Sequence, residues 1–111
     1  MNNKNFNKHF ISPEYSIRSA IKMLNKVAKL GNNKFCLVLG KHQNVLGTVT
    51  DGDIRRGLLK NYSLENKVEK IYKKNPLVTR KVLSENEIKK ILDKKDITFL
   101  PLVDSKNKIL D

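Results

Sequence analysis

The sequence predicts an α/β (α+β) fold built from two related halves, and two patterns in the chain support this prediction. In the first half, a helical apolar pattern after Ser16 is followed by two short apolar strands and a further helix, which gives the order β-α-β-β-α. In the second half this order begins again, with Ser84 in the place of Ser16 and FLPLV in the place of KFCLV. Such self-similarity indicates tandem copies of one supersecondary unit, packed about a pseudo-twofold axis.

The first helix is predicted from Ser16 onward. Its apolar residues follow the i, i+3, i+4, i+7 spacing of one helix face. Ser16 is a suitable N-cap, and Gly31-Asn32-Asn33 supplies a left-handed stop. The residues of this apolar face are Ile17, Ala20, Ile21, Leu24, Val27 and Ala28.

The segment after this helix predicts two adjacent strands and two helices. KFCLVL is a buried strand, GKHQN a turn and VLGTVT a second strand. A helix then begins at Asp51 or Gly52. A short second helix is expected after Asn61-Tyr62, with Ser63 as its cap, and it ends before Pro76 because proline disfavours helix in the preceding residue.

The second half repeats this order and stops before completing it. LVT is a short extended piece, and Ser84 and Glu87 have the capping-box spacing that opens a helix. ITFLPLVD is expected to be a buried strand, SKNK a turn and IL the start of another strand. We expect a mobile arm over residues 1–10, the first repeat with its linker over 11–72, and an incomplete second repeat over 73–111. A longer polypeptide is the simpler explanation of the missing elements, and a partner strand is the alternative.

Composition favours a small cytoplasmic protein. The chain has 111 residues, 39% of them hydrophobic, which suffices for one compact domain. It shows no apolar run of membrane-spanning length and no secretory signal at its start. One cysteine and two histidines exclude a disulfide framework and a zinc cluster. Cys36 lies in an apolar run, so we expect a buried structural thiol.

The formal net charge of +12 raises the possibility of a nucleic-acid partner. Two features argue against it. Only 4 of the 23 basic residues are arginine, whose planar fork recognises bases and phosphates, and the lysines are spread along the whole chain. Aromatic residues make up 6% and are not interleaved with the basic residues. Nucleic-acid binding is therefore the least favoured hypothesis.

The junction between the second strand and the following helix carries the candidate site. Asp53 offers two acceptor oxygens that match a ribose diol, and Thr50 offers a hydroxyl beside the free N–H groups of the helix start. Gly52 leaves room for a ligand. A helix cap is the alternative, worth about 0.5–2 kcal/mol, and from the residues alone it is the favoured interpretation. No catalytic set and no metal-binding carboxylate cluster is seen, so this part of the chain is not expected to be an enzyme.

The order and spacing of these motifs resemble a known family. From about Ile11 to Asp111, the strings VLGTVTDGDIRRGLL, KVEKIYKKNPLVT and DITFLPLVDSKNKIL resemble the cystathionine-β-synthase (CBS) domain pair, or Bateman module. The most specific part is the G-x-x-T-x-x-D pattern of Gly47, Thr50 and Asp53. Two departures are Cys36, where the second copy has Pro101, and Tyr72, where the linker commonly has methionine.

The resemblance implies a regulatory module that binds AMP, ATP or a related adenosyl ligand between its two copies. It makes ligand binding by Thr50 and Asp53 the favoured interpretation, and it leaves Asp51 as a cap. It also implies that a homodimer forms through the modules. The other residues expected to border the ligand are Gly52, Arg55 and, through their main chain, Lys34, Phe35 and Leu37. Arg55 and Arg56 are expected to face a phosphate, solvent or a neighbouring domain.

The string TDGDIRR resembles a narrower group, the modules attached to bacterial sugar-phosphate enzymes. In one group the module precedes a nucleotidyltransferase of the mannose-1-phosphate guanylyltransferase type, and in another it follows a sugar-phosphate isomerase domain. Its position near Met1 favours the first, with a covalently linked catalytic domain beyond residue 111. A ligand-free module that pairs catalytic domains remains the alternative function.

Overall fold

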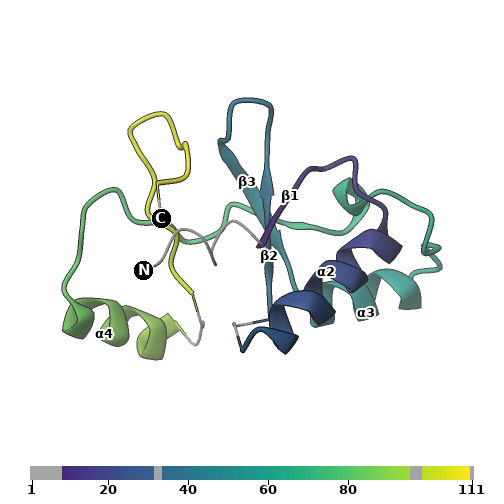
Figure 1. The fold of residues 1–111 in the computed structure, drawn as a ribbon, viewed down its shortest axis with the longest axis horizontal. Helices are drawn as coiled ribbons and strands as arrows, with labels where there is room; N and C mark the ends of the chain where they lie inside the picture. The colour runs from purple at the N-terminus through teal and green to yellow at the C-terminus, as the bar shows by residue number, and fades with distance from the viewer. Residues whose placement is uncertain (1–8, 32–33, 96–98, 111) are drawn as a thin grey trace.

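The computed structural model describes residues 9–31, 34–95 and 99–110. They form a mixed four-stranded sheet and three α-helices, in agreement with the predicted α/β class (Figure 1). None of the helices in this described part has the length and apolarity needed to span a bilayer. In chain order the elements are β1 (Phe10–Ile11), α2 (Ile17–Lys29), β2 (Cys36–Leu39), β3 (Val45–Val49), α3 (Asp51–Leu59), the 3-10 helix η2 (Val68–Lys70), β4 (Lys73–Lys74) and α4 (Glu85–Lys95).

The sheet has the order β1-β2-β3-β4. β1 is parallel to β2, and the pairs β2–β3 and β3–β4 are antiparallel. Cys36 pairs with Val49, so the start of β2 lies beside the end of β3, where α3 begins. β4 pairs with β3, so the sheet of the first half extends past the predicted boundary at residue 73.

Gly47 is required where β4 approaches β3. A Cβ atom at this position would collide with the carbonyl oxygen of Lys73 and with the ring of Tyr72. The close approach of these two segments therefore depends on the missing side chain.

Helices α2 and α3 cover one face of the sheet and form the first core (Figure 1). The predicted cap of α2 is confirmed, because the Ser19 N–H donates to Ser16 Oγ at 3.0 Å. Gly31 has a φ of +79°, the left-handed conformation expected after the helix. Ala28, at the edge of the predicted apolar face, is exposed. The buried core residues on this side are Ile11, Ile17, Ala20, Leu24, Cys36, Val38, Val49, Ile54 and Val68.

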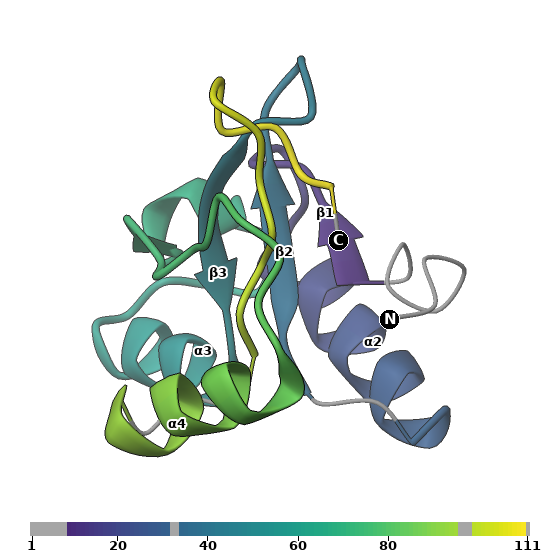
Figure 2. The ribbon, with the colours of Figure 1, turned by 90° about the vertical axis from the view of Figure 1, so that its left-hand side faces the viewer.

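The opposite face of the sheet is covered by the second half, as Figure 2 shows for the segments around β2 and β3. The contact is aromatic: the Phe35 ring stacks against Phe99 with 3.8 Å between ring centroids and against His9 with 4.3 Å. Val103 of the second half is fully buried against this cluster. The other buried members are Leu37, Leu39 and Val45.

The predicted mobile arm is two residues too long. His9 is 4% exposed, and its Nδ1 donates to the carbonyl oxygen of Phe35 at 2.7 Å. Phe10 belongs to β1 and pairs with Leu37. Burial of two aromatic rings against β2 holds this segment in place. Residues 1–8 lie outside the described part of the chain.

The helix expected after Ser63 is not formed, and only the three-residue η2 is helical in that segment. The backbone there has another role. The carbonyls of Leu64 and Asn66 accept hydrogen bonds from Arg18 N and Ile17 N at 2.9 and 2.8 Å. These amides belong to the first turn of α2 and have no partner inside that helix. The segment therefore stays irregular because it caps α2.

The second half repeats the predicted order with much less regular pairing. The capping box of α4 is confirmed, since Ser84 N donates to Glu87 Oε1 and Glu87 N to Ser84 Oγ, both at 3.2 Å. The expected strand ITFLPLVD begins outside the described residues, and its described part makes isolated bridges only. Leu102 pairs in parallel with Thr79, and Val103 pairs antiparallel with Ile109. This repeats the parallel-then-antiparallel order of β1, β2 and β3 without a continuous ladder.

The turns of the two halves lie side by side (Figure 2). Val45 N donates to the carbonyl of Asn107 at 2.8 Å, and Asn107 Nδ2 returns a bond to the carbonyl of Val45 at 2.7 Å. Ile109 N donates to the carbonyl of Gln43 at 3.0 Å. These bonds fix the register of one half against the other.

Replacing Phe99 by alanine is expected to separate the halves. The substitution removes the ring stacked on Phe35, and because Phe99 is only half-buried the loss should lie near the low end of the roughly 3–5 kcal/mol seen for buried aromatic residues. Urea denaturation measures it. Val82→Ala is the matched control, since that side chain is 85% exposed. Equal stability of the two variants would contradict this account of the contact.

Cys36 is expected to be unreactive until the protein unfolds. Burial raises the pKa of its thiol to about 12, from an ordinary value of 9.0. The unfolded state therefore loses its proton first, and the free energy of unfolding should fall as the pH rises from about 9 toward 12. Alkylation by iodoacetamide at increasing urea concentrations measures the protection. Rapid labelling of the native protein at neutral pH would show that the thiol is accessible.

Candidate functional site

The start of α3 lies where β2 begins and β3 ends, and it brings several of the predicted site residues together. Thr50 is the N-cap of α3, and Gly52 and Asp53 belong to its first turn. Lys34 lies just before β2, and its Nζ is 2.8 Å from Asp51 Oδ2. The antiparallel register of β2 and β3 therefore places Lys34 beside the Thr50–Asp53 junction.

The carboxylate of Asp53 is fully engaged within the chain. Its Oδ2 accepts hydrogen bonds from the Thr50 N–H at 2.9 Å and from the Thr50 hydroxyl at 3.1 Å. Its Oδ1 pairs with Arg56 Nη2 at 2.7 Å, and the residue is only 8% exposed. Asp53 and Thr50 thus form the capping box of α3. The prediction that Asp51 is the cap is wrong, because Asp51 is the first helical residue and pairs with Lys34.

Arg56 occupies the space that the sequence assigned to a ligand. A Cβ atom built on Gly52 would lie 3.2 Å from Arg56 Nη1, so the guanidinium lies over the glycine. The Arg56 side chain is 62% exposed and can therefore move away. Arg55 was the arginine expected in the site, but it is exposed and makes no ion pair with any described residue. The i, i+3 spacing of Asp53 and Arg56 was the signal for their pairing.

Lys34, Phe35 and Leu37 were expected to border a ligand through their main chain. The Phe35 carbonyl already accepts from His9, and its ring is buried between His9 and Phe99. Leu37 is fully buried in a strand that has β1 on one side and β3 on the other. A main-chain contact of Leu37 with a ligand stays a prediction, and Lys34 is the member of this group whose side chain is accessible.

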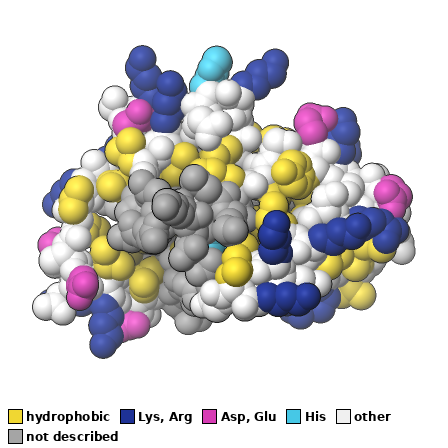
Figure 3. Space-filling view, viewed as in Figure 1, with side chains coloured by type: hydrophobic (Ala, Val, Ile, Leu, Met, Phe, Trp, Pro, Cys, Tyr) yellow, Lys and Arg dark blue, Asp and Glu magenta, His cyan; other side chains and the backbone are white. Residues whose placement is uncertain are grey.

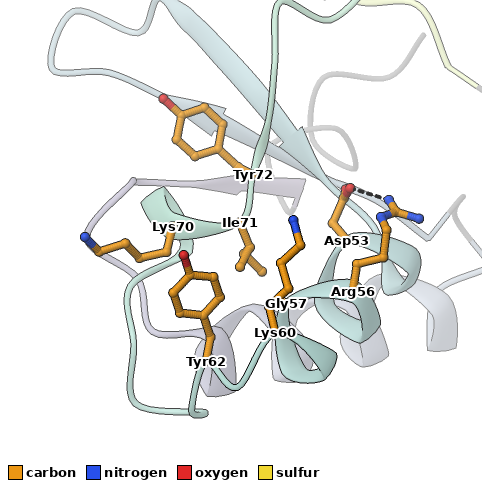
Figure 4. A pocket seen from close by; sticks show the side chains of 8 residues that line it. All are labelled: Asp53, Arg56, Gly57, Lys60, Tyr62, Lys70, Ile71 and Tyr72. Atoms are coloured by element: carbon orange, nitrogen blue, oxygen red, sulfur yellow. Dashed lines mark hydrogen bonds and ion pairs between the residues drawn. The ribbon is translucent and has the colours of Figure 1, made fainter.

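A pocket of about 170 Å³ opens on the other side of Asp53, between α3 and the linker that follows it (Figure 4). We call it the linker pocket. No sequence motif marks this pocket, although Asp53, Arg56, Gly57 and Lys60 have the i, i+3, i+4, i+7 spacing of one helix face. Its lining residues are Asp53, Arg56, Gly57, Lys60, Tyr62, Lys70, Ile71 and Tyr72.

The positive charge is distributed over the molecule. Figure 3 shows lysine and arginine side chains at several separate places on one face, with acidic side chains among them. In residues 9–31, 34–95 and 99–110, no group of three or more histidine, cysteine or acidic side chains is placed to hold a metal ion.

Comparison with known proteins identifies relatives of this chain, although no family model matches it. It is 32% identical over 108 residues to the inosine-5′-monophosphate dehydrogenase of Bacillus subtilis, a match that covers 93% of this chain and 20% of the dehydrogenase. The chain spans about a fifth of the length of the curated relatives that it matches.

Solved structures show the same fold. The CBS domains of a transcriptional regulator from Streptococcus pneumoniae superpose with a TM-score of 0.75 at 16% identity, covering 94% of this chain and 81% of that one. CBSX2 in complex with AMP gives 0.74 at 20% identity, covering 92% and 77%. GMP reductase from Trypanosoma brucei gives 0.76 at 21% identity, covering 92% and 22%. The chain therefore has the fold of a CBS domain pair.

Two aspartates in the same helical turn should differ strongly in their effect on stability. Asp53→Ala removes the buried capping carboxylate, and we expect a loss of about 1–2 kcal/mol. Asp51→Ala removes only a surface ion pair, for which we expect less than about 0.5 kcal/mol. Thermal and urea unfolding of both variants measure the difference. Equal losses would show that the Asp53 network does not hold the start of α3.

Proposed function

We propose that this chain is a regulatory module that binds an adenine nucleotide or a related adenosyl ligand at the start of α3. The observation that supports this proposal most directly is the pairing of a hydroxyl and a carboxylate, Thr50 and Asp53, at a helix N-terminus in the fold of a CBS domain pair. A carboxylate accepts two hydrogen bonds from a ribose diol, and the N-terminus of a helix attracts phosphate.

Binding requires an exchange of partners at Asp53. In the structure Arg56 donates to one carboxylate oxygen and Thr50 to the other. The ribose hydroxyls would replace Arg56, whose exposed side chain is free to turn to solvent or to the ligand. Lys34 lies beside the start of α3 and would neutralise the charge of a phosphate. It can leave Asp51 for this, because their ion pair is a surface contact. Gly52 would leave space once the guanidinium has moved.

Ligands of similar proteins support the chemical class. The similar CBSX2 structure contains AMP. A CBS domain pair that is 22% identical, with a TM-score of 0.70, was solved with 5′-methylthioadenosine and S-adenosyl-L-methionine. All three ligands contain an adenosine moiety, and we propose that this chain recognises that moiety.

A ligand-free assembly module is the second candidate function, and one observation favours it. Every oxygen of the Asp53 carboxylate already has a partner within the chain, so the fold does not need a ligand to satisfy a buried charge. In that case the module would serve to pair two copies of a larger protein, through the homodimer that the sequence predicts.

The parent protein remains a separate hypothesis. The sequence predicts a linked nucleotidyltransferase or, alternatively, a sugar-phosphate isomerase. The relatives reported above are a dehydrogenase, a reductase and a transcriptional regulator, and they give no support to either context. The nucleotidyltransferase context therefore stays a prediction.

Calorimetric titration with AMP, ATP and S-adenosyl-L-methionine tests the ligand-binding function. We expect at least one of them to bind. Asp53→Asn should weaken binding roughly 10-fold to 100-fold, because it removes a charged acceptor from the ribose. Asp93→Asn, at an exposed position of α4, is the control and should bind as the native chain does. The proposal fails if none of the three ligands binds, or if Asp53→Asn binds with unchanged affinity.

Light scattering, combined with the titration, distinguishes the two candidate functions. A regulatory module is expected to bind its ligand in the titration, whether it is a monomer or a dimer. A stable dimer that binds none of the ligands and whose mass is unaffected by them would instead support the assembly function.

A further inference from the structure

We propose that the linker pocket is a binding site for a phosphate group. This site goes beyond the proposed adenosyl site and does not require it, although the two share Asp53 as a common wall. The phosphate group is either free phosphate or the phosphate of a larger ligand.

The pocket has two walls, which meet where Gly57 contacts Ile71. One is a face of α3 that carries Asp53, Arg56 and Gly57, continued by Lys60 at the C-cap of the helix. The other is the linker segment that carries Tyr62, Lys70, Ile71 and Tyr72.

Gly57 forms the floor of the pocket and has no side chain, so the linker can approach the helix closely there. A Cβ atom at Gly57 would come within 2.6 Å of Ile71 Cγ2, so the linker packs directly on the helix backbone at this point. Figure 4 shows the ammonium group of Lys60 reaching into the space between Ile71 and Asp53.

The charges of the pocket favour an anion. Three cationic side chains and one carboxylate line it, and in Figure 4 the ammonium group of Lys60 lies in the space while that of Lys70 points away from it. The Arg56 charge is offset by Asp53, but no acidic side chain in the described ranges forms an ion pair with Lys60 or Lys70. A concave site with uncompensated positive charge raises the local concentration of anions.

The size of the pocket selects a small anion. Its volume of about 170 Å³ is well below the roughly 300–1,000 Å³ of pockets that enclose drug-sized ligands. A single phosphate group fits in this volume. Arg56 suits this role because its guanidinium has several donors, so the donors that Asp53 does not use stay available to phosphate oxygens.

Phosphate in the linker pocket competes with Asp53 for Arg56. A bound phosphate attracts the guanidinium toward Lys60 and weakens its contact with the carboxylate, which is then released for other partners. Occupation of the pocket is thus expected to favour diol binding at Asp53.

The test is a titration of the full chain with sodium phosphate at constant ionic strength, followed by the backbone amide NMR signals of Gly57, Lys60 and Ile71. We expect saturable shifts at these amides. Lys60→Ala should weaken binding roughly fivefold to tenfold, because it removes one charged donor. Lys26→Ala, on the exposed side of α2, is the matched control and should leave the affinity unchanged.

Two further ligands identify the source of the phosphate group. If free phosphate does not shift these amides but AMP does and adenosine does not, the pocket takes the phosphate of a nucleotide. The proposal is overturned if neither phosphate nor AMP shifts them, or if Lys60→Ala and Lys26→Ala change the affinity equally. Adenosine binding that is lost in Asp53→Asn, with the phosphate shifts retained, would separate this site from the adenosyl site.

Discussion

The structure depends on the position of β2, which is buried on both faces and paired on both edges. Cys36 and Val38 point to the core under α2 and α3, while Phe35, Leu37 and Leu39 point to the second half. This follows from the period of two in a strand, which sends alternate side chains to opposite faces. One continuous apolar run therefore holds together two halves that make few regular hydrogen bonds to each other.

The candidate site is a consequence of this arrangement. The register of β2 on β3 fixes where β3 ends, and α3 must begin there with its first N–H groups unpaired. The Asp53 carboxylate accepts a hydrogen bond from the Thr50 N–H, and it is itself paired with Arg56. A ligand at this position competes with internal partners, so its affinity is a difference between two sets of hydrogen bonds.

The fold by itself does not decide the function. Similar structures at 16–22% identity show that the chain has the architecture of a CBS domain pair, and proteins with this architecture include a transcriptional regulator and a GMP reductase. The charged side chains around α3 are the chemistry that this fold presents at the candidate site. Arg56 pairs with Asp53, and Lys60 extends the positive charge toward the linker. The functional hypotheses are therefore hypotheses about these side chains.

Local patterns in the sequence were sufficient for the elements whose stability is local. The caps of α2 and α4, the pairing of β2 with β3 and the burial of Cys36 follow from neighbouring residues and periodicity. Tertiary contacts decided the rest. The segment after Ser63 is irregular because its carbonyls cap a helix far away in the sequence, and His9 is ordered because its ring stacks on Phe35. Arg56 rather than Arg55 reaches the site because only one of two adjacent helical residues can face Asp53. Short-range preferences act through the backbone of a few residues, whereas these contacts exist only after distant segments have packed together.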